Sequence, residues 1–315
     1  MKNKLVGVTG SSGFVGKALM EELRLRGAQP VGLFRSDLVG QYHTKDQKIY
    51  STSETEALNN LGCIVHCGAR VHQQKFSFLN KKNYYEDNVL NTIELARRAN
   101  KNGVKRFIFL STVKVNGEQS TMGHPFSLRD SPCPRGNYAI SKYQAELELI
   151  ELAKISEMEI VILRIPLVYG KNAKANFKVL LKLISMGVPL PFKGENKHLR
   201  SFLHIDNLTD LIIKCIVSED KLHDIFYASD NDDASIERLI ILINNSMETQ
   251  SRLFYLPYNI FNMLNKIPYI GNLTSKLTNP LQVDISETLK KLKWKPVVNL
   301  QEGLRRSIKV FESNN

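Results

Sequence analysis

The feature that most constrains this chain is a run of glycines directly after its first predicted strand. Residues 5–9 (LVGVT) are apolar and β-branched, which favours a short buried strand. Glycines then recur every third residue, and helical apolar spacing runs from Phe14 to Arg26. Glycine permits the sharp turn and close backbone approach that a pyrophosphate requires, and a helix N-terminus attracts its charge. The pattern predicts a dinucleotide-binding loop formed by Gly10, Ser12, Gly13, Phe14, Val15 and Gly16.

Strands and helices alternate through the first half of the chain. Further strands are predicted at 30–34, 63–68, 105–110 and 160–163, and the main helices between them at 84–100 and 138–156. This alternation indicates a parallel sheet covered on both faces. We therefore expect an α/β fold with a Rossmann-type doubly wound parallel sheet and a smaller, mixed α/β C-terminal domain that binds the substrate. The NAD(P)-binding domain would comprise 1–170, completed by parts of 203–232, and the substrate domain 171–202 and 233–315.

Composition excludes several other classes of protein. The 43 Lys and Arg residues exceed the 31 Asp and Glu residues, so the formal net charge is +12, but the basic residues are dispersed and argue against a nucleic-acid-binding arm. The apolar runs are shorter than the ~18 residues of a membrane span. The four cysteines form no metal-type pair. We expect a cytoplasmic protein without a metal; residues 255–270 could rest on a membrane surface, although packing over the substrate is favoured.

The end of the second predicted strand distinguishes between two cofactors. An acidic residue there binds a free ribose hydroxyl, whereas an arginine accommodates a 2′-phosphate. Arg35 comes first after the strand, and Ser36 can donate a second hydrogen bond. This order favours NADP(H). NAD(H) stays open, because Asp37 could occupy the acidic position and Arg35 could stack on adenine.

A phenol and an ammonium group lie four residues apart on one predicted helix, at Tyr138 and Lys142. A free tyrosine has a pKa of ~10, which is too high for efficient proton transfer at neutral pH. A lysine cation beside it, together with an oxidised pyridinium cofactor, would lower that pKa. Tyr138 is then predicted to exchange a proton with a reacting hydroxyl or carbonyl oxygen.

The T-G-x-x-G-x-x-G loop and the Y-x-x-x-K helix together resemble the extended short-chain dehydrogenase/reductase superfamily, also called the NAD-dependent epimerase/dehydratase family. The resemblance implies a third catalytic residue, Thr112, three residues before the valine of a V-Y-G-like turn; Ser111 is the neighbour that could be confused with it. It also places residues 66–70 along the cofactor. Cofactor contacts are implied for Cys67, Gly68, Ala69, Asn88 and Pro166, in addition to Tyr138 and Lys142.

The same resemblance assigns the substrate side. It places a nucleotide diphosphate near Asn176 and Phe177, a stacking ring at Phe192 and phosphate contacts at Arg200 and Arg252. Asp206 would cap the following helix, and His204 would be structural. The remaining sugar-side residues are Arg70 and Lys114; Lys114 and Arg252 could equally be surface residues.

Three departures from the superfamily pattern bear on the reaction. Val113 and Lys114 stand where 4,6-dehydratases carry an Asp-Glu pair, which disfavours dehydration. Asn116 replaces the usual tyrosine of the turn, and residues 50–52 lack the expected aspartate contact to adenine.

Stretches at 69–72, 111–118, 167–177 and 281–286 resemble one branch of the superfamily. These are bacterial enzymes of surface-polysaccharide clusters, often labelled UDP-glucose 4-epimerase-like. The branch implies NAD(P)H-dependent reduction of a UDP-4-keto-6-deoxy-N-acetylhexosamine in O-antigen or capsule biosynthesis. The alternatives are a UDP-hexose 4-epimerase of the UDP-glucose or UDP-GlcNAc type with retained NAD, and a non-catalytic dinucleotide sensor. The resemblance also implies a homodimer formed through the helices that carry Asn88 and Tyr138.

Overall fold

A parallel sheet forms the centre of the molecule. The computed structural model of the protein describes residues 1, 4–34, 49–51, 55–70, 83–171, 176–247, 251–257 and 278–313. Its seven strands follow the order β3-β2-β1-β4-β5-β6-β9, and all six pairings are parallel. They are β1 (Leu5–Thr9), β2 (Gln29–Phe34), β3 (Ile49–Ser51), β4 (Cys63–His66), β5 (Arg106–Thr112), β6 (Glu159–Ile165) and β9 (Asp224–Tyr227).

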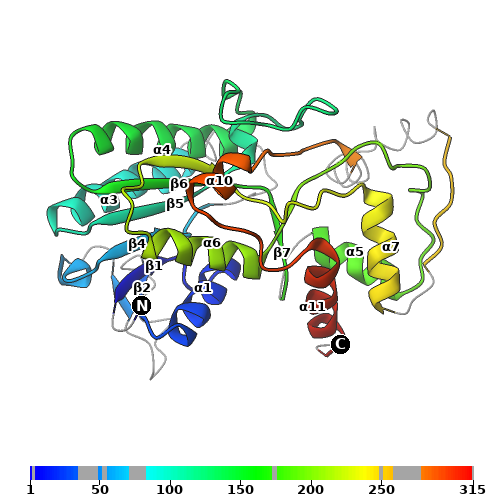
Figure 1. Ribbon diagram of the computed structural model, residues 1–315, viewed down its shortest axis with the longest axis horizontal. Helices are drawn as coiled ribbons and strands as arrows, with labels where there is room; N and C mark the ends of the chain where they lie inside the picture. Colours follow the sequence, from blue (N-terminus) through cyan, green and yellow to red (C-terminus); the bar gives the residue numbers. More distant parts are fainter. Residues whose placement is uncertain are drawn as a thin grey trace.

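Helices cover both faces of this sheet, as Figure 1 shows. On one face, α1 (Phe14–Leu25) and α6 (Ile205–Val217) bury leucines and isoleucines against β1, β5 and β6. On the other, α3 (Asn91–Lys101), α4 (Gly136–Lys154) and the short η2 (Thr55–Leu58) pack on the same strands. A π-helical segment, η3 (Glu86–Leu90), leads into α3. The predicted doubly wound α/β fold is therefore confirmed.

A third hydrophobic cluster lies beyond the C-terminal edge of the sheet. It joins α5 (Asn176–Ser185), α7 (Ile236–Met247) and α11 (Leu300–Ser313) to a small parallel pair, β7 (Leu167–Tyr169) and β8 (Phe202–His204). The chain returns to the main sheet through α10 (Ser286–Lys291), where Thr288 donates a hydrogen bond to the Tyr227 carbonyl. The division of the chain into two domains stays a prediction.

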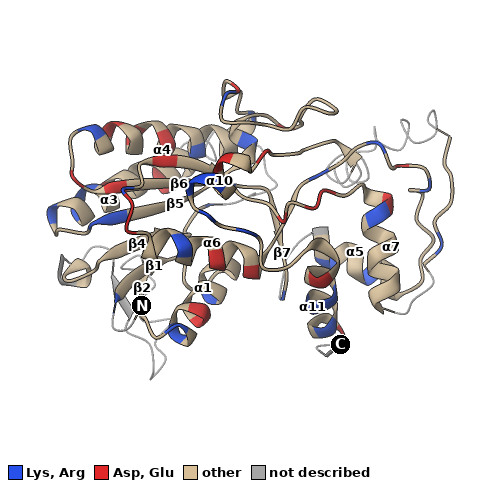
Figure 2. Ribbon diagram, viewed as in Figure 1, with Lys and Arg blue, Asp and Glu red and all other residues tan. Residues whose placement is uncertain are grey.

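Two further observations concern the surface. Basic and acidic side chains are interspersed along α4 and α11 (Figure 2). None of the helices in the described part of the chain has the length and apolar character that a membrane span requires.

The sheet order reverses beside β1, and this reversal positions the site. Strand β1 pairs with β2 on one side and with β4 on the other, so the connections after β1 and β4 leave toward opposite faces. Ligands of open α/β sheets bind in the crevice that such a reversal leaves at the carboxyl ends of the strands. The glycine loop follows β1 at this point.

Candidate active site

The glycine loop leaves little or no room for side chains at its three glycines. Gly10 has a φ of +62°, and a Cβ there would lie 2.8 Å from the backbone nitrogen of Gly68. At Gly16 a Cβ would lie 2.1 Å from the Gly10 carbonyl oxygen, and at Gly13 it would lie 3.1 Å from the same atom. The loop therefore presents backbone in front of the N-terminus of α1. This cradle fits the pyrophosphate of a dinucleotide.

The loop after β4 lies against this cradle. The expected strand over 63–68 ends at His66, so Cys67 and Gly68 belong to the loop. Gly68 donates a backbone hydrogen bond to Thr9 Oγ1 over 3.1 Å. Asn88, on the π-helical turn, accepts from the Arg70 amide over 2.7 Å and donates to Ser141 Oγ over 3.0 Å. The structure thus brings the predicted cofactor residues after β1 and β4 together with α4.

Tyr138 and Lys142 lie on successive turns at the start of α4. Lys142 is buried, and its Nζ lies 3.7 Å from the centroid of the Phe109 ring. Burial lowers the pKa of Lys142 to about 7, although the charge of Glu146 opposes this shift. Burial also raises the pKa of Tyr138 to about 12. Burial is the main cause of this rise, and Tyr84 adds to it. The lowering expected beside Lys142 and an oxidised cofactor stays a prediction.

The end of β5 separates the two candidate hydroxyls. Consecutive strand residues point to opposite faces. Ser111 is buried and donates a hydrogen bond to Glu146 on α4. Thr112 instead caps a short 3-10 turn, η4 (Val113–Val115), and accepts from the Lys114 amide over 3.3 Å. Ser111 therefore has a structural partner, and the assignment of Thr112 to the substrate oxygen stays a prediction.

A buried polar network beneath the site was missed from the sequence. Glu146 and Arg164 form an ion pair over 2.6 Å with side chains 0% and 5% exposed. Arg164 also donates to Asn116 Oδ1, which accepts from the Tyr227 hydroxyl as well. Only the position of Glu146, one helical turn after Lys142, hinted at this role. Asn116, the departure noted in the turn, is thus a buried acceptor that joins the end of η4 to β6 and β9.

Several residues predicted to face the substrate have partners within the chain. Arg70 pairs with Asp87 over 2.5 Å, and Arg200 donates to the Asn279 carbonyl. Burial lowers the pKa of Arg200 to about 10. Both Phe177 and Phe192 are buried in the third cluster, where Phe177 packs against Tyr169. Their contacts with a substrate stay predictions.

The other predicted site residues occupy varied positions. Lys114 lies half-buried on η4, Pro166 is buried between β6 and β7, and Arg252 is exposed. Asn176 is the first residue of α5. The cofactor-selecting residues Arg35 and Ser36 lie outside the described residues, so the preference for NADP(H) stays a prediction.

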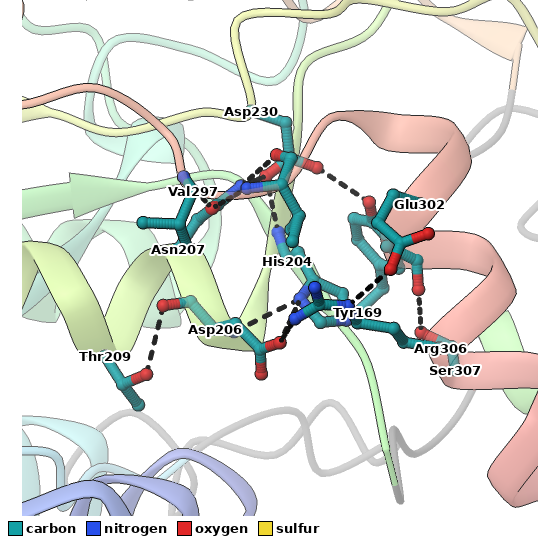
Figure 3. A network of polar contacts seen from close by, with 12 residues as sticks. Tyr169, His204, Asp206, Asn207, Thr209, Asp230, Val297, Glu302, Arg306 and Ser307 are labelled. Carbon is teal, nitrogen blue, oxygen red and sulfur yellow. Dashed lines mark hydrogen bonds and ion pairs between the residues drawn. The ribbon is translucent and has the colours of Figure 1, made fainter.

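A second polar network joins the substrate side to the sheet (Figure 3). Asp230 accepts from the Tyr169 hydroxyl over 2.8 Å and from Asn207 Nδ2 over 2.7 Å. Burial raises the pKa of Asp230 to about 6. Asp206 was expected to cap α6, but this is wrong: His204 is the cap, and its Nδ1 accepts from the Asp206 amide. The Asp206 carboxylate instead pairs with Arg306 on α11.

Comparisons with known proteins agree with this geometry. Residues 6–226 match the NAD dependent epimerase/dehydratase family. A UDP-glucose 4-epimerase of Vibrio cholerae is 36% identical over 99% of this chain and 97% of that protein. A dTDP-4-dehydro-6-deoxyglucose reductase of Escherichia coli is 26% identical, covering 96% of each. The structure of a UDP-glucuronic acid 4-epimerase from Bacillus cereus in complex with NAD superposes with a TM-score of 0.77, at 20% identity over 98% of this chain and 99% of that chain. The chain therefore belongs to the NAD-dependent epimerase/dehydratase family, within the extended short-chain dehydrogenases/reductases.

Proposed function

We propose that this protein is a nucleotide-sugar oxidoreductase that acts at sugar carbon 4. Its first candidate reaction is the NAD(P)H-dependent reduction of a UDP-4-keto-6-deoxy-N-acetylhexosamine. The branch-specific stretches at 69–72 and 111–118 support this substrate. One structural observation carries the proposal: Tyr138 and Lys142 lie on successive turns at the start of α4, and Thr112 ends β5. Burial raises the pKa of Tyr138, so the phenol is neutral near pH 7. A neutral phenol can donate a proton to the oxygen of a ketone that is being reduced.

Each residue has a role in this proposal. Thr112 would hold the C4 oxygen through its hydroxyl, and Tyr138 would protonate that oxygen as it gains negative charge. Lys142 would place a cation beside the phenol and stabilise the phenolate left behind. The glycine cradle, residues 67–69, Asn88 and Pro166 would hold the dinucleotide. A nicotinamide bound there supplies hydride exchange with carbon 4.

The test follows NADPH absorbance with the 4-keto UDP-sugar as substrate. We expect stoichiometric oxidation of NADPH. Replacing Tyr138 with Phe should lower kcat by roughly 100-fold or more, because proton transfer is lost. Tyr143→Phe, on the next turn of α4, is the matched control and should retain activity. If neither NADPH nor NADH is oxidised, the reductase proposal is wrong.

A 4-epimerase is the second candidate, favoured by the 36% identity to the Vibrio cholerae protein. Tyr138 would then act first as a base and later as an acid on the same oxygen. This reading predicts interconversion of UDP-glucose with UDP-galactose, or of their N-acetyl forms, with no net consumption of dinucleotide. Chromatography of the UDP-sugars distinguishes the two reactions. A dinucleotide sensor would keep its biological activity in the Tyr138→Phe variant.

The proposal includes a homodimer. Apolar side chains on η3 and α4 remain exposed in the single chain, including Leu90 at 51% and Leu147 at 45%. Pairing of these helices between two chains would bury them. Light scattering after gel filtration should show a dimer, and Leu147→Glu should weaken it; a monomeric wild-type protein would exclude this assembly.

A further inference from the structure

His66, at the end of β4, makes a hydrogen bond with each of its ring nitrogens although only 8% of the residue is exposed. Its Nδ1 lies 2.8 Å from Thr9 Oγ1, at the end of β1. Its Nε2 lies 3.0 Å from Thr92 Oγ1, on α3. One imidazole therefore connects two strands of the sheet with a helix that packs on them.

The neighbouring bonds fix which nitrogen carries the proton. Thr92 donates its single hydroxyl hydrogen to the Asn88 carbonyl over 2.9 Å, so it can only accept from His66 Nε2. Nδ1 is then an acceptor, and Thr9 donates to it. Thr9 Oγ1 in turn accepts from the Gly68 amide. The reverse tautomer would leave the Thr9 hydrogen and the Asn88 carbonyl without these partners, so the arrangement selects the Nε2–H form.

Both ends of this chain of bonds reach the candidate site. At one end, Gly68 lies against Gly10 in the dinucleotide cradle, where no Cβ fits between the two backbones. At the other end, Asn88 donates to Ser141 Oγ, and Ser141 donates to the Tyr138 carbonyl over 2.9 Å. The bonds lead from the cradle to the Asn88 backbone carbonyl, and the Asn88 side-chain amide links this residue to the first turn of α4.

The surroundings keep the ring neutral. His66 stacks beside Phe107 and Phe109, each with its ring centroid 5.9 Å away. Burial lowers the pKa of His66 to about 3, and the charge of Lys142 adds to this shift. A protonated ring would also need an acceptor at Nδ1, where Thr9 offers its hydrogen. The neutral ring alone satisfies every partner.

We propose that His66 is a positioning residue that holds the dinucleotide cradle and the Tyr138 helix in register through its two ring nitrogens. Its Nδ1 fixes the approach of the loops after β1 and β4, and its Nε2 fixes the π-helical turn that supports α4. The inference rests on the proposed roles of the cradle and of Tyr138, and it does not depend on which sugar is the substrate.

Two substitutions remove the hydrogen bonds at Nδ1 and at Nε2 separately. In His66→Gln the longer amide can donate to Thr92 but no longer accepts from Thr9. In His66→Asn the shorter amide can accept from Thr9 but no longer reaches Thr92. Loss of one buried hydrogen bond corresponds to roughly a tenfold change in an equilibrium. We expect His66→Gln to weaken NADP⁺ or NAD⁺ binding about tenfold in calorimetry, whereas His66→Asn changes this affinity by less than about threefold.

The catalytic side has a separate measurement, amide exchange of the 136–142 peptide. His66→Asn should accelerate this exchange about tenfold and lower kcat in parallel, while His66→Gln leaves the peptide near the wild-type rate. His223→Gln, an exposed histidine in the loop before β9, is the control and should change neither measurement. Dinucleotide affinity and amide exchange need no sugar, so failure of the proposed reaction leaves this test intact.

Equal effects of the two His66 variants on affinity and exchange, or no effect of either, would overturn the proposal. If neither variant folds, Thr92→Val should reproduce the His66→Asn behaviour and Thr92→Ser should restore it. Nitrogen-15 NMR of the wild-type ring should show the neutral Nε2–H tautomer, and an Nδ1–H tautomer would equally refute the inference.

Discussion

Lys142 carries an ammonium group whose burial costs free energy. Only 1% of it is exposed, and its Nζ rests on the Phe109 ring. Removing an ammonium group from water disfavours its charged form, and this desolvation is the main reason that its pKa falls to about 7. The ligand-free chain therefore holds a cation that it solvates poorly. A neighbouring phenolate would recover part of that cost.

The stability of the Lys142→Met variant tests this cost. In the wild-type protein the folded-state pKa of about 7 lies below the unfolded value of ~10.4, so the unfolded chain binds more protons between these two values. The free energy of unfolding should therefore rise with pH across this window. Lys142→Met should be more stable than wild type by roughly 4 kcal/mol near pH 6–7, and the gain should shrink toward pH 9.5. Urea unfolding at both pH values measures it.

The control is Lys154→Met, because the Lys154 side chain on the same helix is 62% exposed. It should change the free energy of unfolding little at either pH. A Lys142→Met variant that is less stable than wild type near pH 7 would show that the contact with Phe109 outweighs desolvation. Its loss of catalysis would not enter this comparison.

At the scale of single residues, the sequence predicted which residues lie near one another better than it predicted their surroundings. Tyr138 and Lys142 were selected from their spacing and Thr112 from the family resemblance, and the structure places them at the start of α4 and the end of β5. The raised pKa of Tyr138 in the chain was not predictable from spacing, because burial depends on every element packed around the ring. The cap of α6 was assigned to Asp206 rather than His204 for a similar reason. A histidine can accept at Nδ1 only when its other nitrogen and its rotamer permit it.

Among the elements, α4, β5 and β6 are joined by polar groups inside an otherwise apolar layer. Ser111, Glu146 and Arg164 belong to three different elements and meet where all are buried. A buried ion pair contributes little net stability but leaves an uncompensated charge when one partner is removed. The pair fixes β6 against α4, and the hydrogen bond from Ser111 to Glu146 fixes β5 there, close to Thr112 and Lys142.

A double-mutant cycle tests this arrangement. Glu146→Leu and Arg164→Met should each lower the free energy of unfolding by about 3–5 kcal/mol, because each leaves a buried charge unpaired. The double variant should lose much less than the sum, with a coupling of about 2 kcal/mol or more. The exposed pair of Lys154 with Glu151 is the control, and its coupling should stay below about 0.5 kcal/mol. Additive losses at Glu146 and Arg164 would contradict the interpretation.

The elements themselves were predictable because their signals are local. Apolar periodicity predicted β1, α1, β5 and α4 to within a few residues. The networks were not predictable in this way: Asn116 and Tyr227 are 111 positions apart, and no local pattern links them. The π-helical turn at Asn88 was also missed, since its extra residue leaves the helical apolar spacing almost unchanged.

Across the whole molecule, the chain crosses between the sheet and the third cluster several times. One crossing is the segment 279–285, orange in Figure 1. Ser201 donates a backbone hydrogen bond to the Leu281 carbonyl, and its hydroxyl accepts from the Val283 amide. The same segment exchanges backbone hydrogen bonds with Phe126, in the loop that follows Thr112 and η4. It thus ties the third cluster to the loop that follows Thr112 and η4.

The overall topology was predictable from the alternation of strands and helices, because parallel strands joined by helices can be arranged in few ways. The position of segment 279–285 was not predictable, since its contacts with Phe126 and Arg200 are isolated bridges without repeating sequence signals. Its position depends on how the third cluster docks, which the hydrophobic pattern alone does not encode. Coupling between the two sides is therefore a property of the assembled chain.

Amide exchange in a Ser201→Ala variant measures this coupling. The substitution removes the acceptor for Val283 and the donor to Asp233, so the segment should open more easily by about 1–2 kcal/mol. Exchange should therefore accelerate roughly tenfold or more in peptides covering 279–285 and, through Phe126, in those covering 118–128. Ser185→Ala, on the exposed surface of α5, is the control. Faster exchange confined to 199–203 would mean that the segment and the catalytic loop open independently, and that substrate contacts cannot be relayed to Thr112 by this path.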